Sequence, residues 1–564
     1  MSINPAEFRP PVEKDEFITG IGDDPDNRLE AGVLFVGAGP ASLAGAIRLS
    51  QLLEDEPELM ESLGEIPIAI LEKGKYPGAH LLSGAVINPM GFKKLFPDMD
   101  VSEFPFFDQV KGEAVYYLTD KSSFRLPTPP TMHNKGNYVA SISKVGEWLG
   151  QKAEEAGVMI FNEMAGDKLI IEDGTVKGVK TDDKGLDKDR NEMGNFQPGT
   201  DILAKTTVLG EGTTGHLSMA LIEHFNLERK NPQIYALGVK EIWEVPKPLK
   251  QVIHTMGWPL RGSKKYGEFG GSWIYPMGDN KVSLGLVVGL DYSDSKLSVH
   301  DLLQKLKLHP MVSKIIEGGK RADNGWGAKT IPEGGYYAVP ESLNVPGAVI
   351  IGDSAGLVNV PALKGVHYAM MSGIMAAESI FAALKEKKDL SAADTLDSYN
   401  EELKNSFIMK DLYSVRNMRQ AFQGGFLKGF IMAGLMTVTK GLFPGGRFAS
   451  HHDYEKELFI GDDPDYPKPD GKITFDKLTS VYESGNRTRD NQPDHIRIIK
   501  DVPEALGEAW INMCPAQVYE WDESEGKRVI RTDPSNCVQC GAITSKGGRL
   551  LPPEGGGGPE YKET

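Results

Sequence analysis

The feature that most constrains this chain is a glycine-rich turn between an apolar strand and an alanine-rich helix. The sequence VLFVGAGPAS places Gly37, Gly39 and Ser42 after the apolar run 31–36 and before the helical segment 41–53. Backbone N–H groups at such a helix start can hold a pyrophosphate. Ser42 stands where a third glycine lets the helix approach the strand, and its side chain is small enough to do the same. The pattern predicts a β-α-β unit that binds a dinucleotide.

A second apolar strand, residues 66–71, ends at Glu72. An acidic residue at this position binds the ribose hydroxyls, which favours FAD or NAD over NADP. Glu72 lies farther along the chain than the roughly 20 residues usually seen. The acidic segment 54–65 accounts for the surplus as an insertion. A glycine-rich turn that binds no ligand is the alternative, and the strand-turn-helix-strand context disfavours it.

Two later motifs favour FAD over NAD. TTVLGEGTTGH carries Gly212, where a strand returns to the nucleotide, and VIIGDSAGLVNV carries Gly352, Asp353 and Gly356. In the second motif a strand end presents the aspartate to ribityl hydroxyls, and a helix start faces the flavin. This order of motifs is that of FAD enzymes of the glutathione-reductase and hydroxylase type. We therefore predict an α/β, Rossmann-like FAD-binding domain.

Charge and cysteine content exclude several classes of protein. The formal net charge of −17 disfavours nucleic acid as a partner, because its phosphates require a basic face. All three cysteines, Cys514, Cys537 and Cys540, lie near the C-terminus. The C-x2-C pair indicates a metal or redox site in a reducing compartment rather than a disulfide framework. We expect no transmembrane helix and no secretory signal, since no long uncharged apolar run is present.

Changes in composition along the chain divide it into segments. We expect a polar N-terminal tail (1–30), a first part of the FAD domain (31–215), an inserted α+β domain (216–335), a return to the FAD domain (336–450), a linker (451–472) and a small C-terminal module (473–564).

Long and unusual segments of the sequence resemble the electron transfer flavoprotein–ubiquinone oxidoreductase family over roughly residues 30–564. The segments that carry the resemblance are GAHLLSGAVINP (78–89), GNYVASISKVGEWLGQKAEEAGV (136–158), HTMGWPL (254–260), GGSWIYP (270–276), LGLVVGLDY (284–292), EGGKR (317–321), NVPALKGVHYAMMSGIMAAESIF (359–381), CPAQVYEW (514–521), NCVQC (536–540) and PEGGGGP (553–559).

The resemblance implies a quinone-binding function for the inserted domain and a ferredoxin-like fold with an iron–sulfur cluster for the C-terminal module. It implies that electrons from reduced electron transfer flavoprotein reduce a membrane quinone to quinol, an electron-transferring-flavoprotein dehydrogenase activity. FAD suits this reaction because it exchanges one electron or two. The expected location is a peripheral one, on the cytoplasmic face of a prokaryotic inner membrane or the matrix face of the mitochondrial one.

The resemblance also implies roles for particular residues. Ser83 and Gly84 are expected near the isoalloxazine ring, and Gly270 and Gly271 are expected to line the quinone pocket, where bare backbone can approach a carbonyl oxygen. Lys364, together with His367, is a candidate electrostatic partner of the flavin. A β-bulge or tight turn is the alternative for the glycine pair, and a structural role is the alternative for the lysine and histidine.

Membrane contact is expected from the segment FLKGFIMAGLMTVTKGLF (426–443). Its only charges are Lys428 and Lys440, both near its ends. Such a helix can lie in the interface while its lysines reach the headgroups. Phe104–Phe107 is a second apolar candidate. A helix buried in a protein core is the alternative for residues 426–443.

The cysteine pattern departs from that of the family. A four-iron cluster normally takes four thiolates, and the family pattern places a further cysteine where this chain has Ile543. The chain could hold a three-iron cluster, or a four-iron cluster with hydroxide or the oxygen of Thr544 or Ser545 as fourth ligand. A zinc ion with three thiolates and a module without any cluster are further alternatives. The three retained cysteines favour a cluster over none.

Two other functions remain as alternatives. One is an FAD-dependent reductase or hydroxylase of a hydrophobic small molecule, which would react with NAD(P)H. The other is a redox adaptor subunit of a membrane dehydrogenase complex, which would bind FAD without reducing quinone by itself.

Overall fold

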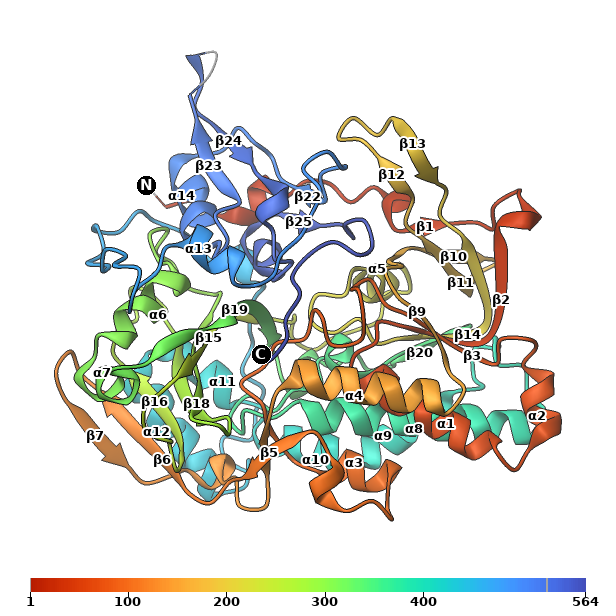
Figure 1. Ribbon diagram of the computed structural model, residues 1–564, viewed down its shortest axis with the longest axis horizontal. Helices are drawn as coiled ribbons and strands as arrows, with labels where there is room; N and C mark the ends of the chain where they lie inside the picture. Colours follow the sequence, from red (N-terminus) through yellow and green to blue (C-terminus); the bar gives the residue numbers. More distant parts are fainter. Residues whose placement is uncertain (1, 524–525) are drawn as a thin grey trace.

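The computed structural model describes residues 2–523 and 526–564 (Figure 1). A large sheet with its helices lies at the right of this view, a second sheet lies at the left, and the C-terminal module lies above the second sheet. The segment expected to form a polar tail packs against the protein. Phe17 is buried, residues 18–19 join the large sheet, and Ile3 forms a bridge with Leu458. Such short pairings leave no periodic signal in a sequence.

The large sheet has nine strands, with the order β1-β10-β11-β14-β2-β3-β9 and with β21 pairing with both β14 and β20. Its strands are β1 (Ile18–Thr19), β2 (Arg28–Val36), β3 (Ile68–Leu71), β9 (Met159–Phe161), β10 (Gly166–Glu172), β11 (Thr175–Thr181), β14 (Asp201–Leu209), β20 (Asn344–Val345) and β21 (Ala348–Ile350). The central strands β21, β14, β2, β3 and β9 run parallel. The nucleotide-binding motifs therefore meet at the carboxyl ends of neighbouring strands.

Two helices that are distant in the chain cover the centre of this sheet in close contact. They are α1 (Pro40–Leu53) and α8 (Val366–Lys385). A Cβ atom at Gly373 would lie 2.0 Å from the carbonyl oxygen of Ala41, and one at Gly45 would lie 2.8 Å from that of Gly373. The missing side chains let the two backbones touch, which brings the strand-Gly-Asp segment before α8 beside the first glycine turn.

The second sheet has seven strands in the order β19-β15-β18-β17-β16-β6-β7. They are β6 (Glu113–Leu118), β7 (Ser123–Leu126), β15 (Tyr235–Glu244), β16 (Val252–Gly257), β17 (Gly270–Pro276), β18 (Lys281–Gly289) and β19 (Lys320–Pro332). The expected inserted domain, 216–335, omits β6 and β7. These strands join the sheet because β6 pairs parallel with β16, a long-range contact that no local pattern reveals.

Smaller elements complete the fold. The remaining strands are β4 (Val86–Ile87), β5 (Phe106–Gln109), β8 (Tyr138–Ala140), β12 (Lys184–Leu186), β13 (Glu192–Gln197), β22 (Ile496–Arg497), β23 (Tyr519–Asp522), β24 (Val529–Thr532) and β25 (Arg549–Leu550). The remaining α-helices are α2 (Pro57–Ser62), α3 (Met90–Leu95), α4 (Ile142–Glu155), α5 (His216–His224), α6 (Val299–Lys307), α7 (Pro310–Ile316), α9 (Asp397–Asn405), α10 (Phe407–Ser414), α11 (Met418–Ala421), α12 (Phe426–Val438), α13 (Lys477–Tyr482) and α14 (Glu504–Met513).

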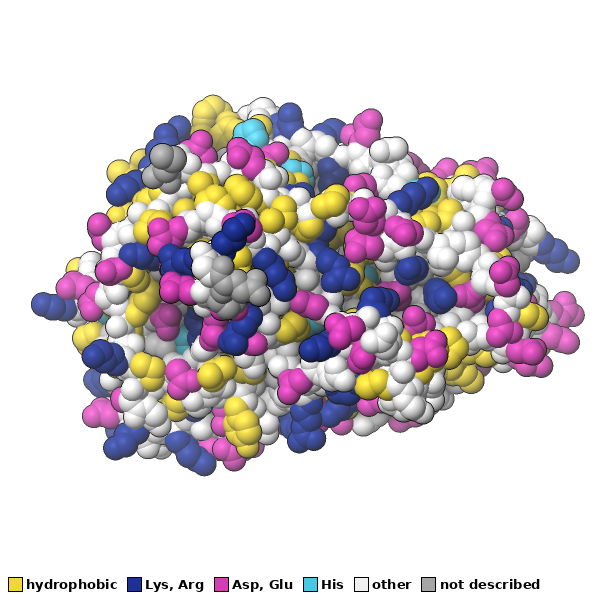
Figure 2. Space-filling model, turned by 90° about the horizontal axis from the view of Figure 1, so that it is seen from above, with side chains coloured by type: hydrophobic (Ala, Val, Ile, Leu, Met, Phe, Trp, Pro, Cys, Tyr) yellow, Lys and Arg dark blue, Asp and Glu magenta, His cyan; other side chains and the backbone are white. Residues whose placement is uncertain are grey.

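On the face seen in Figure 2, acidic and basic side chains are interspersed. In the part of the chain that the structure describes, no helix combines the length and apolarity needed to cross a bilayer.

Candidate functional site

One cavity of about 910 Å³ is lined by residues of both sheets and of the C-terminal module. We call the part lined by Gly37, Gly39 and Glu72 the nucleotide end. We call the part lined by Gly270, Gly271 and helix α12 the apolar end. Most residues predicted for the cofactor and both residues predicted for quinone therefore face one continuous space, although they come from separate sheets.

The nucleotide end is built mainly from backbone. Gly37 has a φ of +88°, and a Cβ atom there would lie 3.0 Å from the carbonyl oxygen of Gly210. At Gly39 the nearest atom would be 3.8 Å away, so the turn leaves room beside it. Helix α1 begins one residue later, and no described side chain caps its start. Unpaired N–H groups at an open helix start fit the pyrophosphate of FAD.

Glu72 stabilises this turn while it faces the cavity. Its Oε2 accepts a hydrogen bond from the N–H of Ala38 at 2.8 Å, and its Oε1 accepts one from the N–H of Gly74 at 2.6 Å. Burial raises the pKa of Glu72, and the two backbone donors oppose that shift. A carboxylate held in this way retains acceptor capacity for ribose hydroxyls.

Three of the predicted cofactor residues, Ser42, Gly352 and Gly356, do not line the cavity. They pack between the elements that form its wall. The buried Ser42 Oγ has no hydrogen-bond partner among the described residues, and it lies only 2.2 Å from where a Cβ atom at Gly210 would be. Gly352 has a φ of +62° and contacts α1, and Gly356 lies against Gln233. Small residues at these positions allow close packing of the elements that carry the turn.

The other two motifs reach the cavity through Gly212 and Asp353. Ser354 Oγ donates to the carbonyl oxygen of Gly212 at 3.1 Å and joins the two motifs. Burial raises the pKa of Asp353 to about 6. Glu211, which the sequence placed in a glycine motif, accepts hydrogen bonds from the N–H and Oγ of Ser218 and so caps α5.

The loop predicted to lie near the flavin ring joins the two ends of the cavity. Ser83 and Gly84 both line the cavity. Lys240 Nζ, from β15, donates to the carbonyl oxygen of Ser83 at 2.8 Å, and burial lowers the pKa of this lysine to about 7. A Cβ atom at Gly84 would lie 3.3 Å from both Trp273 and Tyr275 of β17. The loop that carries Ser83 and Gly84 therefore lies directly against β17, the strand that begins at the predicted quinone residues.

The glycines of the apolar end are required by the second sheet itself. A Cβ atom at Gly270 would lie 2.0 Å from the carbonyl oxygen of Val287, and one at Gly271 would lie 2.6 Å from that of Thr255. Both residues still line the cavity. Both glycines are therefore needed for packing, which was the alternative to quinone contact. Their backbone nevertheless faces the cavity.

Two histidines and a lysine face the middle of the cavity. His254 Nδ1 lies 3.3 Å from the hydroxyl of Tyr275, and its buried Nε2 has no partner among the described residues. Burial, reinforced by Lys364, lowers the pKa of His254 to about 3 and that of His367 to about 4. Burial also lowers the pKa of Lys364 to about 8. The histidines are therefore neutral at physiological pH.

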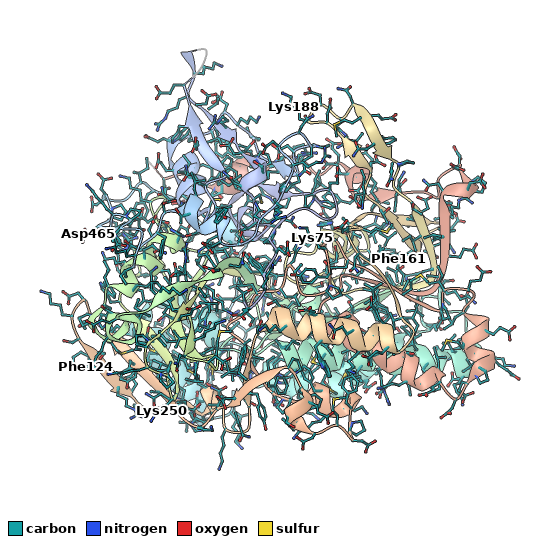
Figure 3. All side chains as sticks on the ribbon, in the orientation of Figure 1. Lys75, Phe124, Phe161, Lys188, Lys250 and Asp465 are labelled. Carbon is teal, nitrogen blue, oxygen red and sulfur yellow. The ribbon has the colours of Figure 1, made fainter. Side chains whose placement is uncertain are left out.

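The mouth of the apolar end is formed by exposed apolar side chains. Helix α12 buries only Gly429 and Met436, which rules out the buried-helix alternative. The exposed apolar side chains on α12 and just after it are Leu427 (73%), Phe430 (47%), Ile431 (55%), Leu435 (42%), Val438 (85%), Leu442 (78%) and Phe443 (54%). Phe124, on the outer strand β7, is 56% exposed (Figure 3), and the ring of Tyr117 on β6 lies 5.7 Å from that of Phe426.

The second apolar candidate, Phe104–Phe107, was wrong. Phe104 is only 4% exposed, and its ring lies 5.3 Å from that of Phe92 and 5.9 Å from that of Trp148. Phe106 lies 4.9 Å from Phe92 in the same aromatic cluster. The sequence showed the apolar run, but only tertiary packing decides which aromatic side chains are covered.

The three cysteines gather in the C-terminal module. Burial and the neighbouring thiols raise the pKa of Cys537 and, to about 12, that of Cys540. Cys514 Sγ accepts a hydrogen bond from the N–H of Val518 at 3.5 Å, and Cys537 Sγ accepts one from the N–H of Gln539 at 3.4 Å. Buried thiols ionise only where positive charge lies nearby, which the irons of a cluster would supply, and N–H···S contacts are typical of cluster ligands. These residues therefore fit an iron–sulfur cluster held by three thiolates.

One alternative for this module, a fourth ligand from Thr544 or Ser545, is disfavoured by side-chain contacts. The Thr544 hydroxyl donates to the carbonyl oxygen of Gly541 at 2.8 Å, and the Ser545 hydroxyl donates to Asp453 at 3.0 Å, so either oxygen would lose a hydrogen bond on ionising to bind iron. In residues 2–523 and 526–564 no three His, Cys, Asp or Glu side chains lie close enough to hold one metal ion.

The cysteine loop is attached to both sheets. Lys73, the residue after Glu72, donates to Gln539 Oε1 at 2.7 Å. The N–H and hydroxyl of Thr330, on β19, donate to the carbonyl oxygen of Cys540 at 2.9 and 2.7 Å. Gln539 itself lines the cavity. The loop that carries the thiols therefore lies beside the nucleotide end.

Sequence reasoning missed several titratable residues of the cavity wall, namely Lys73, His80, His216, Lys264, Glu268, Lys329, Glu333, Arg419 and His495. Glu333 directly precedes a Gly-Gly pair and Glu268 precedes one by two residues. An acidic side chain beside bare backbone is a weak signal that would have drawn attention to both.

The fold and the site together define a class of protein. A parallel sheet carries a glycine turn, an acidic strand end and a strand-Gly-Asp segment around one cavity, and a second sheet closes it. This is the arrangement of FAD-binding oxidoreductases. A crystal structure of a geranylgeranyl bacteriochlorophyll reductase-like protein from Thermoplasma acidophilum has the same fold, with a TM-score of 0.54 and 18% identity over 74% of this chain and 92% of that one.

The chain belongs to the electron transfer flavoprotein–ubiquinone oxidoreductase family. It matches the family models "ETF-QO, ubiquinone-binding" over residues 235–331 and "Electron transfer flavoprotein-ubiquinone oxidoreductase, 4Fe-4S" over residues 471–562. It is 40% identical to the mitochondrial electron transfer flavoprotein-ubiquinone oxidoreductase of Dictyostelium discoideum, over 94% of this chain and 90% of that protein. It is 38% identical to the Homo sapiens protein of the same name, over 94% and 89%. The predicted family and fold class are thus confirmed.

Proposed function

We propose that this enzyme accepts electrons from reduced electron transfer flavoprotein and uses them to reduce a membrane quinone to quinol. The observation that carries the proposal is the single cavity that connects the nucleotide end to the exposed apolar helix α12. FAD, when bound, supplies one- and two-electron exchange. The chain holds its nucleotide on backbone at Gly37 and Gly39 and admits a hydrophobic head group past Gly270 and Gly271.

The same proposal assigns α12 to a membrane surface. Its apolar side chains line the cavity on one side and face outward on the other. Lys428 and Lys440 flank the apolar segment and are exposed. An interfacial helix of this kind would let a quinone enter without passing through water. We assign the protein to the cytoplasmic face of a prokaryotic inner membrane, or to the matrix face in a mitochondrion.

Holoprotein with measured FAD content tests the function directly. Reduced electron transfer flavoprotein and a short-chain quinone are mixed with it under anaerobic conditions, and quinol is measured by absorbance. We expect quinol to form only when all three are present. If NAD(P)H replaces the flavoprotein with equal or greater rate, the protein is instead a reductase of another kind.

The proposal includes an iron–sulfur cluster on Cys514, Cys537 and Cys540. Anaerobic purification, with counting of iron and acid-labile sulfide, tests its presence, and low-temperature EPR distinguishes its type. A signal in the oxidised sample indicates three irons, and a signal only after reduction indicates four. Absence of both iron and sulfide would eliminate the cluster. Cys537→Ser should lose iron, whereas Thr544→Val should retain it.

A further inference from the structure

Reduction of a quinone to a quinol requires protons as well as electrons. Two electrons and two protons are added, and each quinone oxygen gains one O–H bond. The apolar end of the cavity is lined mainly by apolar side chains, so a titratable group in its wall is a candidate proton source for the quinone oxygens. This inference rests on the proposed function.

A buried carboxylate group lines the cavity beside the predicted quinone residues. Arg419, on α11, donates from Nε to Glu333 at 2.6 Å and from Nη2 to Asp291 at 2.7 Å. Its guanidinium lies 4.2 Å above the ring of Phe269, the residue before Gly270. Glu333 and Arg419 line the cavity, and their side chains are 5% and 3% exposed. The acid therefore borders the cavity next to the glycine strand.

A third carboxyl group extends this set away from the cavity. Asp453 is 2% exposed, and its Oδ2 accepts hydrogen bonds from the N–H of Tyr235 at 2.8 Å and from Ser545 Oγ at 3.0 Å. Its Oδ1 is buried and has no partner among the described residues. Lys546 interacts electrostatically with both Asp453 and Asp291, and its Nζ donates to the carbonyl oxygen of Tyr292 at 3.0 Å.

The charges of this group do not balance without a proton. Three carboxyl groups, those of Glu333, Asp291 and Asp453, share two buried cations, Arg419 and Lys546. The nearby Lys456 is exposed to solvent, which screens its charge. An uncompensated buried carboxylate takes up a proton rather than remain ionised. Burial and the adjacent Asp291 raise the pKa of Asp453 to about 8, and burial raises that of Glu333.

We propose that Glu333 is the proton donor for quinol formation and that Asp291 and Asp453 resupply it. In each transfer the O–H bond of Glu333 breaks and an O–H bond forms on the quinone oxygen, while the electrons arrive through the flavin route. The carboxylate left on Glu333 regains a proton from the Asp291 and Asp453 pair. Asp291, with 16% of its side chain exposed, connects the set to solvent. Two such transfers complete one quinol.

Single-turnover kinetics of reduced holoprotein test the proposal. Stopped-flow absorbance follows its oxidation by a short-chain quinone and, separately, by ferricenium, which takes one electron and no proton. Glu333→Gln should slow quinone reduction at least about 100-fold, a typical loss for a missing general acid, and leave the ferricenium rate unchanged. In the parent the quinone rate should fall as pH rises and Glu333 loses its proton. That dependence should be absent in Glu333→Gln and return in Glu333→Asp.

Asp291 and Asp294 provide a matched pair on one loop. Asp294 is buried and pairs with Arg261 at 2.9 Å, but it does not contact Arg419 or line the cavity. Asp291→Asn should slow quinone reduction and raise its solvent deuterium isotope effect, and Asp294→Asn should do neither. Glu333→Gln that reduces quinone at the parental rate would overturn the proposal, as would equal effects of the two aspartate variants. A parent that reacts with ferricenium and not with quinone would instead refute the proposed function.

Discussion

The two ends of the cavity are stabilised by different kinds of interaction. The nucleotide end lies on a sheet whose core is a large cluster of apolar side chains, and the turn before α1 presents backbone N–H groups that no side chain of the N-cap residue caps. The second sheet, beside the apolar end, encloses charge instead. Glu241 and Lys307 form an ion pair at 2.7 Å with both side chains fully buried, and Arg321 lies 3.8 Å from the same carboxylate. The nucleotide end is therefore built mainly from backbone over an apolar core, whereas the sheet beside the apolar end also contains a buried ion pair.

The largest expected effect is on stability and tests the buried ion pair of the second sheet. Glu241→Ala should lower the free energy of unfolding by about 3–5 kcal/mol, because Lys307 is left as an unpaired buried cation. Chemical denaturation monitored by tryptophan fluorescence measures it. Glu244→Ala on the same strand is the control, since its partner Lys320 is 69% exposed, and should cost less than about 1 kcal/mol. Equal losses in the two variants would contradict the comparison.

A smaller effect, on FAD affinity, is expected at the glycine turn of the nucleotide end. Gly39→Ala should weaken FAD binding about 10- to 100-fold, because the methyl group would obstruct hydrogen bonds to a charged phosphate, each worth about 1.5–3 kcal/mol. The protein itself has no atom closer than 3.8 Å to the added carbon, so the melting temperature of the apoprotein should not change. Fluorescence titration with FAD measures the affinity. Gly194→Ala, on an open hairpin strand, serves as control, and an apoprotein destabilised by Gly39→Ala would refute this interpretation.

Membrane contact at the apolar end is expected to respond more weakly to a single change. Leu427→Gln should reduce binding to phospholipid vesicles about tenfold, since burying a leucine contributes roughly 1.5–3 kcal/mol and an interface buries it only in part. Co-sedimentation with vesicles measures the binding. Tyr482, 81% exposed on the C-terminal module, offers the control Tyr482→Gln, which should bind as the parent does. A parent that does not bind vesicles would exclude the interfacial helix.

The smallest expected effect is a pH dependence at His254. Its pKa of about 3 in the folded protein lies below the value of about 6.5 in the unfolded chain, because burial opposes the charged form. The unfolded state therefore binds more protons as pH falls below about 6.5, and stability declines from there toward the folded pKa. Between pH 6.5 and 5.5 the parent should lose about 1 kcal/mol more than His254→Asn. Denaturation curves at both pH values measure the difference, and parallel losses would show that the histidine does not contribute.

The C-terminal module was predictable from the sequence only in part. The sequence identified all three thiols and the absence of a fourth at Ile543, because the C-x2-C spacing is local. It left Thr544 and Ser545, which directly follow Ile543, as candidate ligands, because a sequence does not show what a hydroxyl group hydrogen-bonds to. The structure assigns both hydroxyls to other acceptors.

The amino-acid sequence by itself determined the class of this protein and the nucleotide end of its site. The glycine turn, Glu72 and the Gly352-Asp353 segment are short patterns whose geometry follows from backbone conformation and a single strand-to-helix connection. Only the tertiary structure decided the wall of the apolar end. Glu333 and Arg419 lie 86 residues apart in the chain, and Phe104 is buried whereas Phe430 is 47% exposed, although both lie in apolar segments. Such contacts arise when distant elements bury their faces against each other, which no local period or motif records.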